Sequence, residues 1–118
     1  MKKYIILLLV PLTLYLSSFV LAAERADVCV KYKKDFGWSK GYAVQGIVIN
    51  GAELNRAVGS FTRFRPFSTY LVVFWEEGQA SIFELPPLAM GQVPMFETDV
   101  EDQYGRKWKI KEGHTFCY

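Results

Sequence analysis

Hydrophobic and polar residues alternate along most of this chain, which is the period of β-strands. Between residues 26 and 33, Val28, Val30 and Tyr32 fall on one face, and polar, charged or cysteine residues fall on the other. Similar segments occupy residues 42–49, 68–76, 79–85, 97–103 and 106–112, with shorter ones at 60–65 and 115–118. The pattern predicts a mainly β domain, a small antiparallel barrel or sandwich of six to seven strands.

One short segment has helical spacing instead. Asn50 and Glu53 stand at the positions of a capping box, in which the side chain of each residue accepts a hydrogen bond from the backbone N–H of the other. Leu54 and Ala57 then recur at helical intervals. The sequence therefore predicts one short helix after the second strand, with a plain loop as the alternative.

The strand over residues 68–76 is followed by a Glu-Gly pair that suits a two-residue hairpin turn. An uninterrupted hairpin of this kind pairs Trp75 with Ala80 and Leu71 with Glu84. Both faces of the hairpin are largely apolar. Each face therefore needs cover, and a face left uncovered would mark a partner site.

The start of the chain has the order of parts of a secretory signal: Lys2 and Lys3, an apolar run, and small residues up to Ala22. We expect residues 1–22 to be a cleaved signal peptide and residues 23–118 to form a single β-rich domain in the periplasm or outside the cell. A membrane anchor needs about 20 apolar residues, whereas Ser17 and Ser18 end this run early. No membrane span is expected after cleavage.

Export changes the charge of the protein. The chain has 14 Lys and Arg against 12 Asp and Glu, which gives a formal net charge of +2. Loss of Lys2 and Lys3 would leave 12 basic residues against 12 acidic ones, and a net charge of zero. No overall basicity therefore favours binding to nucleic acid.

Two cysteines, Cys29 and Cys117, stand near the two ends of the expected mature domain. In an oxidising compartment they are expected to form one disulfide. A loop of this length contributes roughly 4–5 kcal/mol in the chain-entropy account. Because no Cys-x-x-Cys spacing exists, the pair is predicted to be a structural staple and not a redox or metal site.

The residues give little indication of a catalytic site. His114 is the single histidine, and no serine lies in a nucleophile-elbow context. Glu76 and Glu77 are adjacent but fall at a predicted hairpin tip, where solvated charge is the ordinary role. We predict that the protein is not an enzyme, and keep a small carboxylate-dependent hydrolase as the weakest alternative.

Metal and cofactor binding are not predicted. The acidic run 99–102 lacks the spacing of a calcium loop. With both cysteines in a disulfide, only His114 remains as a nitrogen ligand for zinc.

An aromatic cluster with interleaved arginines is the first candidate binding surface. Aromatic and arginine side chains dominate the energetics of protein interfaces, although core packing is the alternative role for most of this cluster. The cluster comprises Phe61, Phe64, Phe67, Tyr70, Phe74 and Trp75, with Arg63 and Arg65 between them. The residues we predict to contact a partner are Trp38, Phe64, Arg65 and Trp75.

A lysine ladder is the second candidate. Side-chain alternation and the disulfide bring the first and last strands together, so their lysines are expected on one outward face. This lysine face comprises Lys31, Lys33, Lys107, Lys109 and Lys111. It would bind anionic polymers of the cell envelope, or would only protect the sheet from edge pairing.

The sequence thus predicts an exported, non-enzymatic binding module that acts on a protein partner, as an inhibitor or an immunity-type factor. The alternative is a binder of anionic envelope polymers through the lysine face. The identity of the partner does not follow from the residues.

Overall fold

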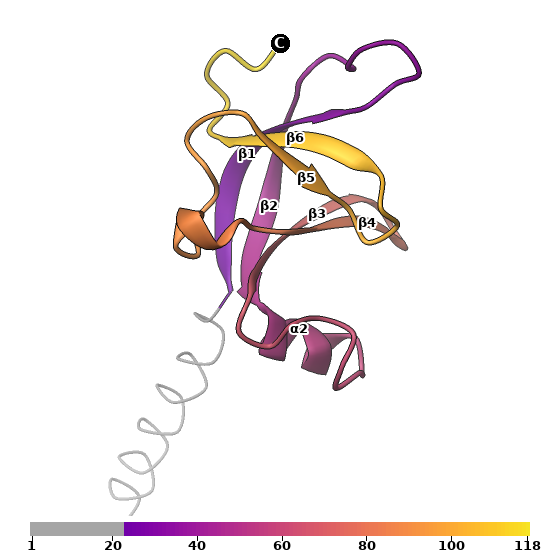
Figure 1. Ribbon diagram of the computed structural model, residues 1–118, viewed down its shortest axis with the longest axis vertical. Coiled ribbons are helices and arrows are strands. Elements are labelled where there is room, and N and C mark those ends of the chain that lie inside the picture. The colour runs from indigo at the N-terminus through magenta and orange to yellow at the C-terminus, as the bar shows by residue number, and fades with distance from the viewer. Residues whose placement is uncertain (1–22) are drawn as a thin grey trace, which may run out of the picture.

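The computed structural model describes residues 23–118, so the expected signal peptide lies outside the described residues. One antiparallel sheet, in the order β4-β3-β2-β1-β6-β5, curls into a half-barrel (Figure 1). The strands are β1 (Glu24–Tyr32), β2 (Tyr42–Asn50), β3 (Thr69–Glu76), β4 (Gln79–Glu84), β5 (Thr98–Glu101) and β6 (Lys107–Glu112). The segments 60–65 and 115–118 form turns and bends rather than strands. The mainly β fold class is confirmed.

The main core fills the concave side of the sheet. Alternate residues of each strand point inward, as period-two patterning requires. Phe83, Leu71 and Ile110 are fully buried there, and Val93 from the loop before β5 joins them. The same alternation sends Cys29, Lys31 and the β6 lysines to the convex side.

A smaller core covers the convex face of β3 and β4. The helix α2 (Gly51–Ala57) begins at Asn50, whose side chain accepts a hydrogen bond of 2.8 Å from the backbone N–H of Glu53. Asn55 then holds the following loop through two hydrogen bonds of 2.8 Å with the backbone of Phe64. Leu54 and Phe64 thereby pack over the hairpin. The predicted helix is present, and with Phe64 it covers Tyr70 and Val72 on the second face of the hairpin. Phe74, on the same face, stays 63% exposed.

The predicted register of the β3–β4 hairpin is wrong by one residue. A bulge at Trp75 lets Phe74 pair with Ala80, and Leu71 pairs with Phe83 instead of Glu84. The extra residue is accommodated because Trp75 turns into the concave side, where its Nε1–H donates to Ser81 Oγ at 2.9 Å. The shift places two buried apolar side chains opposite each other.

The disulfide joins Cys29 on β1 to Cys117, with an S–S distance of 2.05 Å and a sequence separation of 88. It fixes the C-terminal tail against the chain near Gly41. A side chain at position 41 would lie 2.8 Å from the carbonyl oxygen of Tyr118, so glycine is needed for this approach. The predicted staple is confirmed. In residues 23–118 no helix has the length and hydrophobicity to cross a membrane.

The two edge strands, β4 and β5, approach each other through one side chain. Gln103 Oε1 accepts a hydrogen bond of 2.9 Å from the backbone N–H of Ile82, and Gln103 Nε2 donates to the Ala80 carbonyl at 2.6 Å. The amide group therefore replaces a peptide unit of a neighbouring strand. We call the line between β4 and β5 the seam; Gln103 closes it at one end.

Candidate binding site

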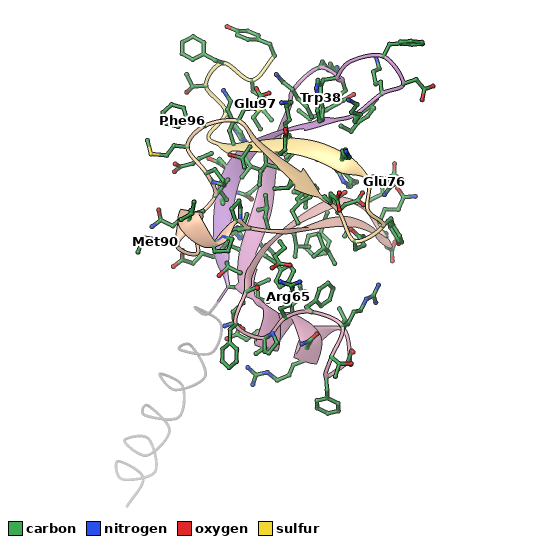
Figure 2. All side chains as sticks on the ribbon, viewed as in Figure 1. Trp38, Arg65, Glu76, Met90, Phe96 and Glu97 are labelled. Atoms are coloured by element: carbon green, nitrogen blue, oxygen red, sulfur yellow. A yellow bond between two sulfur atoms is a disulfide. The ribbon has the colours of Figure 1, made fainter. Side chains whose placement is uncertain are left out.

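An aromatic cleft opens at the end of the half-barrel where the β3–β4 and β5–β6 turns lie. Glu76 marks this end in Figure 2. The cleft has a volume of about 510 Å³. It is lined by Tyr32, Tyr42, Trp75, Gln79, Ala80, Ser81, Tyr104, Arg106 and Trp108. Five adjacent strands (β4, β3, β2, β1 and β6) and the β5–β6 turn thus contribute to one hollow, which no single sequence segment could form.

The rings of the cleft hold one another in place. Trp75 and Trp108 stack with centroids 5.9 Å apart and an interplanar angle of 21°. Tyr42 meets Trp75 edge-on at 6.2 Å, and Tyr32 meets Trp108 edge-on at 5.8 Å. Phe83 extends the cluster into the core, 5.4 Å from Trp108. Such packing fixes the rings before any ligand arrives, which reduces the entropic cost of binding.

Polar groups stand at the rim. The Arg106 guanidinium lies 5.0 Å from the centroid of the Tyr104 ring, and Tyr104 itself is 71% exposed. Arg106 Nε also donates to Asp102 Oδ2 at 2.8 Å. The cleft therefore presents a broad apolar floor with a cation and a phenol at its edge.

Asp102 organises this rim from below. Its side chain is fully buried and accepts hydrogen bonds from the backbone N–H groups of Tyr104 and Arg106, both at 2.9 Å. Trp108 Nε1–H donates to the same carboxylate at 3.0 Å. Burial alone would raise the pKa of Asp102, but the donors from Arg106, Trp108 and Tyr104 outweigh it, and the pKa lies below its ordinary value.

The structure does not bring the four predicted partner contacts together. Trp75 lines the cleft, and Phe64 is buried in the smaller core. Arg65 is 80% exposed and lies 3.8 Å from Glu84. Trp38 is half-buried, and Trp38 and Arg65 stand at opposite ends of the molecule (Figure 2).

Sequence reasoning missed most of the cleft. Tyr32, Tyr42 and Trp108 are inward residues at strand ends, so alternation alone could have placed them on the concave face. It could not place them at the same end of the barrel. That information lies in the strand order and in the pairing of Tyr32 with Trp108 across β1 and β6.

The five lysines of the lysine face are partly engaged by neighbouring groups, and two of them have an acidic partner. Lys31 pairs with Lys109 across β1 and β6, so the ladders do join on one face. However, Lys31 Nζ lies 3.1 Å from Glu97, and Lys109 Nζ lies 3.1 Å from Asp99. Lys111 donates to the backbone carbonyls of the C-terminal tail. Lys33 and Lys109 also flank the Trp38 ring, at 5.4 and 4.8 Å. Few of these charges remain available for an external anion.

Exposed apolar residues gather on the loop that crosses the other side of the barrel. Buried Val93 and a hydrogen bond of 2.7 Å from the Glu112 N–H to the Pro94 carbonyl anchor this loop. Its large outward side chains are Leu88, Met90, Met95 and Phe96. Met90 and Phe96 lie on the side of the molecule away from Glu76 (Figure 2), so this loop is separate from the cleft.

Metal-ligating side chains do not gather in the described part of the chain. No group of three His, Cys, Asp or Glu side chains there is arranged to hold a metal ion. His114 Nε2 lies 2.8 Å from the Val44 carbonyl oxygen. Glu76 and Glu77 are exposed at the hairpin tip.

Comparisons with protein-family models, with curated protein sequences and with solved structures found no significant match to this chain.

Proposed function

We propose that the protein is a non-enzymatic binding module that binds a protein partner through the aromatic cleft. One observation carries this proposal: tyrosine, tryptophan and arginine side chains converge on a single preorganised hollow. These are the residue types enriched in interface hot spots. Tyrosine and tryptophan bury a large area at a small cost in side-chain entropy, and arginine adds several hydrogen-bond donors in a planar group.

The cleft suits a projecting side chain of the partner. Its floor is apolar, and Arg106 with Tyr104 can bond the partner's backbone or a carboxylate at the rim. A rigid antiparallel scaffold with a disulfide staple is well matched to such a role. An inhibitor or immunity-type protein would use the cleft to bind the partner and block its functional site.

The polymer-binding alternative is less well supported. Two of the five lysines form ion pairs, with Glu97 and Asp99, and a third donates hydrogen bonds to backbone carbonyls of the C-terminal tail. Only Lys33 and Lys107 have no such partner within the described residues. A face with about two available cations should give a shallow dependence of affinity on salt.

A pull-down from extract of the producing cells tests the proposal. Wild-type bait at micromolar concentration should retain a specific protein, and Tyr104→Ala or Tyr32→Ala bait should retain at least tenfold less. Arg56→Ala, at an exposed position of helix α2, is the matched control and should retain the wild-type amount. Equal retention by all baits, or retention that vanishes at moderate salt, would argue against the cleft and for the lysine face.

A further inference from the structure

The seam between β4 and β5 leaves backbone groups without a strand to pair with. Leu85 N–H donates to the Thr69 carbonyl at 2.8 Å, so alternate residues of β4, Ala80, Ile82 and Glu84, direct their backbone groups away from β3. Gln103 occupies only the Ala80 carbonyl and the Ile82 N–H. The Glu84 end of this edge is open.

The facing edge of β5 is open as well. Asp102 N–H donates to the Arg106 carbonyl at 2.9 Å. The backbone N–H and C=O groups of Asp102 and Val100 therefore point toward β6. By the same alternation, Asp99 and Glu101 direct their N–H and C=O groups toward the seam. An edge with unpaired donors and acceptors is a template for another strand.

A groove of about 560 Å³ follows the seam on the convex side. One wall carries Arg63 and Arg65, with Glu84 beside Arg65 at 3.8 Å, and the other carries Asp99 and Glu101. Within residues 23–118, Arg63 and Glu101 have no ion-pair partner. The buried side chains of Val100, Phe83 and Leu85 lie on the concave side of the same strands. The opening therefore has opposite charges outside and apolar groups inside.

We propose that the seam binds an extended peptide segment of a partner protein, which pairs antiparallel to β5 through the backbone of Asp99 and Glu101. Strand addition of this kind draws affinity from main-chain hydrogen bonds and selectivity from alternate side chains. The segment would present apolar residues inward at every second position. Its outward positions would carry an acidic residue toward Arg63 and a basic residue toward Glu101. This surface is distinct from the aromatic cleft and does not depend on it.

Selection from a displayed library of random twelve-residue linear peptides tests this inference. Peptides selected on the wild-type protein should share the alternating pattern and should protect the amides of Asp99 and Glu101 from hydrogen exchange. Glu101→Pro removes the N–H group that faces the seam without touching the ladder to β6, and should weaken binding about tenfold. Glu101→Ala keeps that N–H group and should change affinity less than threefold.

Two further measurements keep the test decisive. If Glu101→Pro does not fold, a selected peptide that is N-methylated at alternate positions should lose about tenfold affinity for the wild-type protein. Tyr104→Ala should leave peptide binding unchanged, which separates the seam from the cleft. Failure to enrich any peptide, or binding that tolerates both the proline and the N-methyl groups, would overturn the proposal.

Discussion

The strongest stability prediction concerns Asp102, the buried carboxylate below the cleft. All four of its hydrogen-bond donors come from the β5–β6 turn and strand β6: two backbone N–H groups, Arg106 Nε and Trp108 Nε1. Asp102→Asn keeps one acceptor oxygen. The other oxygen becomes an NH₂ group. Depending on its orientation, this group faces either the backbone N–H groups of Tyr104 and Arg106 or the side-chain N–H groups of Arg106 and Trp108.

The expected loss in the free energy of unfolding follows from this unmatched hydrogen-bond donor. A buried donor left without an acceptor costs about 1–3 kcal/mol, and hydrogen bonds to a charged group are the stronger ones. We expect Asp102→Asn to lower the free energy of unfolding by about 2–3 kcal/mol at pH 7. For a domain of this size the corresponding fall in Tm is roughly 10–20 °C.

The effect has a defined pH dependence. Because the folded-state pKa of Asp102 is lowered, its carboxylate contributes stability fully above the unfolded-state pKa. That contribution is lost as the pH falls through the folded value. The difference between wild type and Asp102→Asn should therefore be largest at neutral pH and should narrow below roughly pH 4.

Urea unfolding followed by tryptophan fluorescence, at pH 7 and at pH 3, measures both quantities. Asp99→Asn is the matched control, because Asp99 is 78% exposed and its ion pair with Lys109 lies at the surface. It should change the free energy of unfolding by less than about 1 kcal/mol. A loss below 0.5 kcal/mol for Asp102→Asn at neutral pH, or a loss that does not depend on pH, would refute the reasoning (roughly the scatter of a surface substitution).

Three further predictions test the scaffold. Replacing Cys29 and Cys117 together by Ala should lower the free energy of unfolding by about 2–5 kcal/mol in urea titrations; an unchanged midpoint would show that the staple does not limit the unfolded chain. Gly46→Ala puts a Cβ 2.7 Å from a methyl group of the facing strand and 3.0 Å from a backbone carbonyl oxygen. It should cost about 1–2 kcal/mol, and a stabilised variant in thermal unfolding would contradict this packing. Gln103→Ala should accelerate hydrogen exchange at the Ile82 amide at least tenfold by NMR, because the clamp across the seam is lost; an unchanged rate would place that amide's protection elsewhere.

Much of the scaffold could be predicted because its determinants are local. Alternation places Val28 and Val30 on β1, the Asn50–Glu53 spacing marks the start of α2, and the Glu-Gly pair forms the turn after β3. Each of these signals depends on neighbours within a few residues. The disulfide was predictable for a different reason, since the chain has only two cysteines to pair.

The register and the cleft depend on longer-range packing. Nothing in the order of residues 70–84 marks Trp75 as the bulged position; the space beside Trp108 and the hydroxyl of Ser81 favour it there. Likewise, Asp102 appears in the sequence as one acid in an acidic run. Its role becomes visible only when Trp108 and Arg106 fold back over it.

Photo-crosslinking tests the central proposal most directly. A benzophenone amino acid would replace Tyr32 at the mouth of the cleft in one variant and Arg56 on helix α2 in the other. Both variants would be irradiated in the same extract of producing cells. We predict one dominant protein adduct from position 32 and none from position 56. Equal adducts from both positions, or no adduct from position 32 although the protein is folded, would contradict the assignment of the aromatic cleft as the partner-binding surface.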